Sequence, residues 1–175
     1  MDKLKRRGIL FVLSSPSGAG KTSIARYILD KDKNIKLSVS LTTRKKRKNE
    51  KAGIDYDFIS KDVFEKKIKN NFFLEWATVF GNYYGTSREK VQKTLQDGND
   101  VLFDIDWQGT QQLSDNKDFD LVTIFILPPS KTVLEKRLNN RAQDSKIEVK
   151  KRMSQASDEI SHYMDYDYIV INNNL

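Results

Sequence analysis

The stretch Ser15-Pro16-Ser17-Gly18-Ala19-Gly20-Lys21-Thr22 directly follows the apolar run Ile9-Leu10-Phe11-Val12-Leu13. A strand that runs into a glycine-rich turn, then Lys-Thr and a helix, is the arrangement of a phosphate-binding loop. Small residues let consecutive backbone N–H groups surround phosphate oxygens, and the helix adds the positive end of its dipole. Lys21 can reach the β- and γ-phosphates, and the Thr22 hydroxyl can bind Mg²⁺. The stretch predicts a nucleotide-phosphate site, with a plain turn and a solvated lysine as the alternative.

Length and composition indicate an ordinary soluble globular protein of one domain, or of one core with small insertions. The chain has 175 residues, of which 38% are hydrophobic and 31% charged, so it can bury a core and is not of disordered composition. Its apolar runs are strand-length, too short to span a membrane, and the run after the basic N-terminus is too short for a secretory signal. The absence of cysteine excludes disulfides and thiolate metal sites. A cytoplasmic protein is therefore expected.

The net charge of +7 is most concentrated at Arg44-Lys45-Lys46-Arg47-Lys48. Such a run is either a solvated loop, a nucleic-acid patch or part of a site for small polyanions. No aromatic residues alternate with the basic ones, as they do in surfaces that stack bases. The lack of alternation argues against a nucleic-acid partner, but composition alone does not identify the partner.

Strand-like and helix-like segments alternate along most of the chain. Strands are expected at 8–14, 98–106, 121–127 and 168–171, and helices at 22–30, 130–139 and 146–164. This alternation predicts an α/β fold with a mostly parallel sheet. Residues 37–87 do not follow this alternation of strands and helices. They contain strand-like pieces at 37–41 and 56–59 and a charged helix at 61–69. They are interpreted as an insertion packed beside the core.

The polar segment 140–146 separates two expected helices and has the composition of a lid or of an ordinary helix–helix turn. Arg137, Arg141 and Arg152 flank it. Arginines that neutralise a transferring phosphoryl group strongly accelerate its transfer. The set therefore suggests a phosphate clamp, and solvated helix faces are the alternative.

Asp104 and Asp106 end an apolar strand. Ligands in open α/β sheets bind at the carboxyl ends of strands, so one aspartate can help hold Mg²⁺ through water. The other is expected to point to the opposite face, toward a neighbouring pocket. Capping of the next helix is the competing interpretation.

The insertion carries a cluster of hydroxyl and guanidinium groups suited to a phosphate monoester: Ser40, Thr42, Thr43, Arg44 and Arg47. Tyr56 and Tyr84 either add hydroxyl donors or pack in a core.

Glu75 lies within Phe73-Leu74-Glu75-Trp76, a carboxylate among large apolar groups. A buried carboxylate needs donors aimed at it, and guanine presents N1–H and N2–H₂ side by side. An exposed, unpaired glutamate is the alternative.

Five segments, in order along nearly the whole chain, resemble those of guanylate kinases, particularly the bacterial ones. They are Ser15-Pro16-Ser17-Gly18-Ala19-Gly20-Lys21, Ser38-Val39-Ser40-Leu41-Thr42-Thr43-Arg44, Gly81-Asn82-Tyr83-Tyr84-Gly85-Thr86, Asp104-Ile105-Asp106-Trp107-Gln108-Gly109 and Pro128-Pro129-Ser130. The resemblance implies a P-loop nucleoside-monophosphate kinase fold. It divides the chain into a core (1–36, 88–129 and 156–175), a GMP-binding insertion (37–87) and a lid (130–155).

The resemblance also implies transfer of the γ-phosphoryl group of ATP to GMP or dGMP, with Mg²⁺. It assigns ATP to Ser15, Pro16, Ser17, Gly18, Ala19, Gly20, Lys21, Thr22 and Asn172, and Mg²⁺ to Thr22 and, through water, Asp104. It assigns the GMP phosphate to Arg44, Arg47, Tyr56 and Tyr84, and guanine to Ser40, Glu75, Thr86 and Asp106. The catalytic set is Lys21, Arg44, Arg137, Arg141 and Arg152.

Three features depart from the family pattern. Ser15 replaces the first loop glycine, Ala142 replaces a lid glycine, and the chain ends at Leu175, before the final helix usual in the family. The family often has a non-glycine residue at the position of Ser15, Ala142 is expected to stiffen the lid, and loss of the helix is expected to uncover apolar surface. A non-catalytic interaction module of the same fold, or a kinase for another small phosphorylated acceptor, remains an alternative.

Overall fold

The computed structural model describes residues 6–140 and 146–174 of the chain. Its central sheet has the strand order β2-β7-β1-β8-β9, and every neighbouring pair is parallel. The strands are β1 (Leu10–Ser14), β2 (Ile35–Leu37), β7 (Asp100–Asp104), β8 (Leu121–Leu127) and β9 (Tyr168–Ile171). The mostly parallel α/β fold predicted from the alternation of segments is confirmed.

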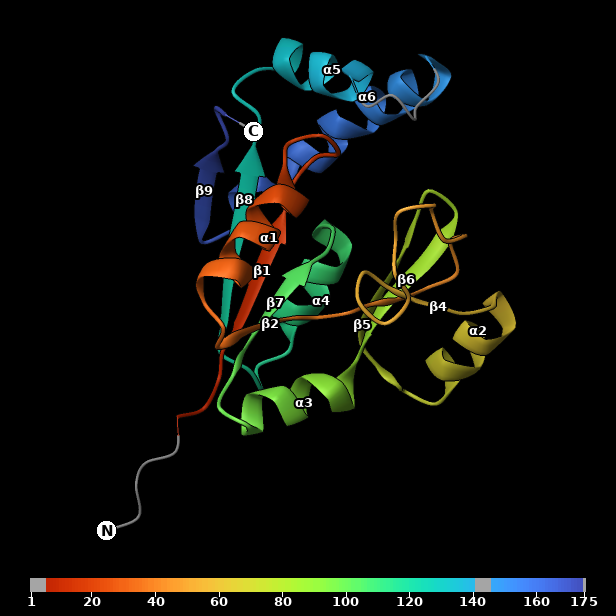
Figure 1. Ribbon diagram of the computed structural model, residues 1–175, viewed down its shortest axis with the longest axis vertical. Helices are drawn as coiled ribbons and strands as arrows, with labels where there is room; N and C mark the ends of the chain where they lie inside the picture. The colour runs from red at the N-terminus through yellow and green to blue at the C-terminus, as the bar shows by residue number, and fades with distance from the viewer. Residues whose placement is uncertain (1–5, 141–145, 175) are drawn as a thin grey trace.

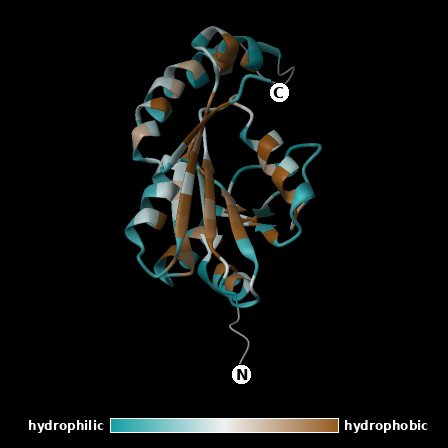
Figure 2. Ribbon diagram, turned by 90° about the vertical axis from the view of Figure 1, so that its left-hand side faces the viewer, coloured by the Kyte–Doolittle hydropathy of each residue, from teal (hydrophilic) through white to brown (hydrophobic). Residues whose placement is uncertain are grey.

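Helices cover both faces of this sheet at its inner strands β7, β1 and β8, which explains why these strands are mostly apolar. Leu10 and Val12 of β1 pack toward α3 (Arg88–Gln96) and α4 (Trp107–Asp115). The next residue in the alternation, Leu13, packs on the other face with α1 (Lys21–Lys31). Figure 2 shows the hydrophobic strands enclosed by helices of mixed polarity.

A second, four-stranded sheet lies beside the first (Figure 1) and has the order β4-β3-β6-β5. Its strands are β3 (Leu41–Thr42), β4 (Asp57–Phe58), β5 (Phe73–Val79) and β6 (Asn82–Ser87). The predicted helix at 61–69 is α2 (Lys61–Lys69), whose fully buried Phe64 stacks on Phe73 at a centroid distance of 4.3 Å. Residues 38–87 thus have a small core of their own.

Helices α5 (Lys131–Asn140) and α6 (Lys146–Ser161) pack on each other through Leu134, Leu138, Val149 and Ala156. They lie beyond the carboxyl end of β8 (Figure 1). None of the helices in the described part of the chain is both long and apolar enough to cross a membrane.

Some boundaries differ from the sequence-based expectations. The expected strand at 37–41 is instead split between β2 and β3, which belong to different sheets, because the chain leaves the central sheet there. The expected helix at 146–164 ends at Ser161, and a short 3₁₀ turn, η1 (Tyr163–Asp165), follows. Helices α3 and α4 had no counterpart in the sequence-based prediction.

Candidate active site

The loop between β1 and α1 requires glycine at two positions. Gly18 and Gly20 have φ angles of 95° and 101°, which side chains rarely tolerate, and Gly20 is the N-cap of α1. A Cβ on Gly18 would also come within 2.9 Å of Leu138 on α5. Ser15 is not among the described residues with positive φ, so its position needs no glycine. Its departure from the loop pattern therefore costs no backbone strain.

The loop forms one end of a cleft of about 490 Å³, and the second sheet forms the other. This volume is typical of small-molecule sites. The predicted site residues that line the cleft are Ser15, Pro16, Ser17, Gly18, Gly20, Lys21, Thr22, Ser40, Arg44, Arg47, Tyr56, Glu75, Tyr84, Asp104, Asp106 and Arg152. Residues from distant parts of the sequence therefore converge on one cavity.

Four of the predicted site residues do not line the cleft but lie behind its surface: Ala19, Thr86, Arg137 and Asn172. The Asn172 side-chain amide donates to the Ala19 carbonyl at 2.8 Å, and Arg137 donates to the Asn172 carbonyl at 2.9 Å. These contacts brace the phosphate-binding loop from behind. Thr86 is buried beneath Ser40, with 3.3 Å between their hydroxyl oxygens. Arg141 and Ala142 lie outside the described residues.

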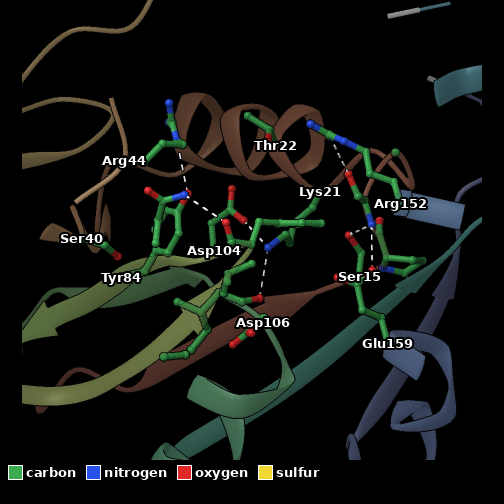
Figure 3. A pocket seen from close by; sticks show the side chains of 18 of the residues that line it. Ser15, Lys21, Thr22, Ser40, Arg44, Tyr84, Asp104, Asp106, Arg152 and Glu159 are labelled. Carbon is green, nitrogen blue, oxygen red and sulfur yellow. Dashed lines mark hydrogen bonds and ion pairs between the residues drawn. The ribbon is translucent and has the colours of Figure 1, made fainter. Parts of the chain in front are cut away.

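Lys21 is held at the carboxyl end of β7 (Figure 3). Its Nζ lies 2.6 Å from Asp104 Oδ1 and donates to the Ile105 carbonyl at 3.0 Å. Thr22 and Asp104 both line the cleft and offer oxygen ligands. No group of three or more His, Cys, Asp or Glu side chains able to hold a metal occurs among the described residues. Thr22 and Asp104 together fit Mg²⁺, which usually binds through only one or two carboxylates and completes its ligands with phosphates and water.

Asp106 does not face away from Asp104, contrary to the sequence-based expectation. The strand β7 ends at Asp104, and Asp106 is already the N-cap of α4. Its carboxylate accepts from the Gly109 N–H at 3.1 Å and from the Gln108 amide at 2.9 Å. The expectation of opposite faces is wrong, because side chains two residues apart along a strand lie on the same face, and because the strand has already ended before Asp106. Both aspartates line the same cleft.

Arg44 and Arg47 meet at Glu50, a residue that the sequence analysis did not select. Arg44 Nη2 donates to Glu50 Oε1 at 2.6 Å, and the Arg47 backbone N–H donates to Glu50 Oε2 at 2.8 Å. Arg44 Nε also donates to the Tyr84 hydroxyl at 3.2 Å. Glu50 is the one acid in the basic run 44–51, which is the signal that could have identified it. It orients the guanidinium group at the edge of the cleft.

Helix α6 reaches the phosphate-binding loop through two side chains. Arg152 donates to the Ser17 hydroxyl at 3.0 Å, and the Ser17 backbone N–H donates to Glu159 at 3.1 Å. Burial raises the pKa of the Glu159 carboxyl, although the Ser17 hydrogen bond opposes this. Sequence reasoning missed Glu159, but its spacing of seven residues from Arg152 places both on one helical face. The loop therefore has contacts to α6.

Glu75 is the most deeply buried acid of the cleft, with 3% of its surface exposed. Burial raises the pKa of its carboxyl to about 7, and the Asp106 charge adds to this, while a hydrogen bond from Thr86 opposes it. Its Oε1 has no hydrogen-bond partner among the described residues. A buried acceptor without a donor is costly, so this carboxylate is suited to a ligand that brings N–H groups.

The raised pKa of Glu75 makes the stability of the ligand-free protein depend on pH. The folded chain keeps this proton up to about pH 7, whereas the unfolded chain releases it near the ordinary value of 4.5. The contribution of Glu75 to the free energy of unfolding therefore falls as pH rises from 4.5 to 7, by about 3 kcal/mol at most. Glu75→Gln should remove this loss. Denaturant unfolding should show the variant gaining stability over the wild type on going from pH 5 to pH 8. An equal difference at both pH values would contradict the assignment.

Comparisons with known proteins agree with this geometry. The guanylate kinase family matches residues 7–175. A guanylate kinase of Bradyrhizobium diazoefficiens is 55% identical over 174 residues, covering 99% of this chain and 80% of the relative. One of Agrobacterium fabrum is 54% identical over 172 residues, covering 98% and 78%.

Among solved structures, the guanylate kinase from Anaplasma phagocytophilum superposes with a TM-score of 0.81 at 38% identity. The match covers 98% of this chain and 80% of that one. Sequence and structure agree over almost all of the described residues, so the chain belongs to the guanylate kinase family.

Proposed function

We propose that this protein transfers the γ-phosphoryl group of ATP to GMP or dGMP, giving ADP and GDP or dGDP. The observation that carries the proposal is the pairing of two ends in one cleft. One end is a phosphate-binding loop with Lys21. The other combines Arg44 with the buried carboxylate of Glu75, whose Oε1 has no hydrogen-bond donor among the described residues. Phosphoryl transfer depends mainly on positioning and charge stabilisation, which this arrangement provides.

The acceptor phosphate is expected to bind between Arg44, Arg47, Tyr56 and Tyr84. The guanidinium group of Arg44 lies over the Tyr56 ring at 5.4 Å from its centroid, so it is already confined. A phosphate monoester can accept from the arginine fork in pairs. Its arrival requires the Glu50 carboxylate to share or yield its contact with Arg44.

Guanine is expected to be recognised by Ser40, Glu75, Thr86 and Asp106. Ionised Glu75 would accept from N1–H and N2–H₂, and adenine offers no such pair of donors. A site built around buried hydrogen-bond acceptors rejects a ligand that leaves them unpaired.

At the donor end, the loop residues and Lys21 would hold the ATP phosphates, and Asn172 would lie near the adenine. Thr22 and, through water, Asp104 would hold Mg²⁺, which neutralises charge on the phosphates when bound. Lys21 would carry the remaining positive charge to the β- and γ-oxygens.

We also propose that the chain works as a core (1–36, 88–129 and 156–175), a GMP-binding insertion (37–87) and a lid (130–155). Arg137, Arg141 and Arg152 would approach the transferring group from the lid. The contacts of Arg152 and Glu159 with Ser17 support a lid coupled to the loop. Closure over both nucleotides would exclude water and limit wasteful hydrolysis of ATP.

A coupled ADP-release assay with Mg²⁺ and ATP tests this function. GMP and dGMP should support turnover, and AMP and UMP should not. Activity with AMP but not GMP would contradict the guanine assignment. Absence of activity with all four would contradict phosphotransfer and favour a binding module of the same fold. Omission of the acceptor gives the background hydrolysis.

A further inference from the structure

Gly109 occupies the third residue of α4, where the backbone does not demand glycine. It is not among the glycines with positive φ in the described part of the chain. Glycine inside a helix is ordinarily less stable than alanine. Gly109 is also fully packed, as it counts among the buried residues of α4. Its lack of a side chain therefore has to be explained by what surrounds it.

The Glu75 carboxylate fills the space that a side chain at 109 would take. A Cβ there would lie 2.6 Å from Glu75 Oε2, closer than real contacts allow, and 3.1 Å from Ile105 Cδ1. A flexible acid on a surface could simply turn away from an added methyl group. Glu75 is 3% exposed and lines the cleft, so its carboxylate can turn away only into the cleft, which would move it from its place against α4.

The same residue contacts the second acid of the proposed guanine site. The Gly109 N–H donates to Asp106 Oδ1 at 3.1 Å. The first turn of α4 therefore lies against both carboxylates. The absence of a side chain at 109 and the N–H at 109 together determine how far apart the two acids lie.

We propose that Gly109 is a specificity-positioning residue, whose missing side chain lets the Glu75 carboxylate lie against α4 beside Asp106. The inference rests on the proposed function and deepens it. Guanine recognition then depends on a residue that does not itself touch the nucleotide. Enlarging it should displace Glu75 and weaken contacts to the 2-amino group most, because that group is a donor and the acceptors expected to meet it are the carboxylates of Glu75 and Asp106.

The test compares GMP with IMP, which lacks the 2-amino group, by titration calorimetry on wild type and Gly109→Ala. The dissociation constant for GMP should rise by about tenfold, which corresponds to loss of one buried, charge-assisted hydrogen bond. The constant for IMP should rise less, and that for ATP should not change. Gln111→Ala, at an exposed position of the same helix, is the matched control and should change none of them. Equal weakening of GMP and IMP, or no weakening, would overturn the inference.

A second variant separates positioning from a general disturbance of packing. Glu75→Asp shortens the acid by one methylene and withdraws it from the methyl group added at 109. The cost of Glu75→Asp to GMP binding should therefore be smaller in Gly109→Ala than in wild type, as a double-mutant cycle measures. Strict additivity would overturn the inference. If wild type itself fails to prefer GMP over AMP, the proposed function fails first. If wild type prefers GMP and Gly109→Ala keeps the same GMP-to-IMP ratio, only the inference fails.

Discussion

Lys21→Ala is expected to reduce turnover by about 10³-fold or more while leaving GMP affinity within about twofold of wild type. Lys21 reaches across the cleft floor from α1 to Asp104, at 2.6 Å, and is placed to meet the donor phosphates. Its charge is needed most when negative charge moves between donor and acceptor, so the loss should appear in kcat. Steady-state kinetics and GMP titration measure the two effects separately.

Lys31→Ala is the matched control, because it removes an exposed lysine from the last turn of the same helix. It should leave both kcat and GMP binding near the wild-type values. If GMP affinity fell together with turnover in Lys21→Ala, donor and acceptor ends would not be separate, and the division of the cleft would be wrong.

Glu75→Gln is expected to lower kcat/KM for GMP by about 10²-fold and leave KM for ATP unchanged. The change converts one acceptor oxygen into an amino donor that faces the donors of guanine. The lost affinity cannot be attributed to unfolding, because the variant should be more stable than wild type at pH 8, where burial of the ionised acid is costly. Comparison of kcat/KM for GMP and IMP measures the effect.

The control is Glu89→Gln, which neutralises an exposed glutamate in the first turn of α3. It should alter neither the ratio of kcat/KM for GMP to that for IMP nor the pH dependence of the free energy of unfolding. Retention of full GMP discrimination by Glu75→Gln would show that the base is read by other residues.

The central strands and the phosphate-binding loop could be predicted because local sequence determines them. The strands β1 and β8 pack against neighbours on both faces and are therefore mostly apolar, and the loop needs glycine wherever φ is positive. Helices α3 and α4 were missed because they are short and largely polar, with only two or three buried positions each. Their N-caps, Ser87 and Asp106, are residue types that often begin helices, but the strand-like pattern of the residues before them took precedence in the prediction.

The site was predicted less completely, because its missing parts depend on tertiary contacts. Arg137 and Asn172 bond to each other and, across 118 and 153 residues of sequence, to Ala19, so only the fold reveals that they brace the loop. Glu159 contacts Ser17 across 142 residues of sequence, which no local motif encodes, whereas Glu50 had a local signal as the one acid in the basic run 44–51. Gly109 carried no signal of its own, because its importance arises only where Glu75 approaches α4.

The most direct test of a single cleft for both nucleotides is titration with a bisubstrate analogue, in which adenosine and guanosine are joined through five phosphates. The account predicts one molecule bound per chain, with GMP and ATP each competing against it. It also predicts that Lys21→Ala and Glu75→Gln each weaken its binding. Competition by ATP but not by GMP, or binding of two molecules per chain, would contradict a shared cleft and with it direct transfer between the nucleotides.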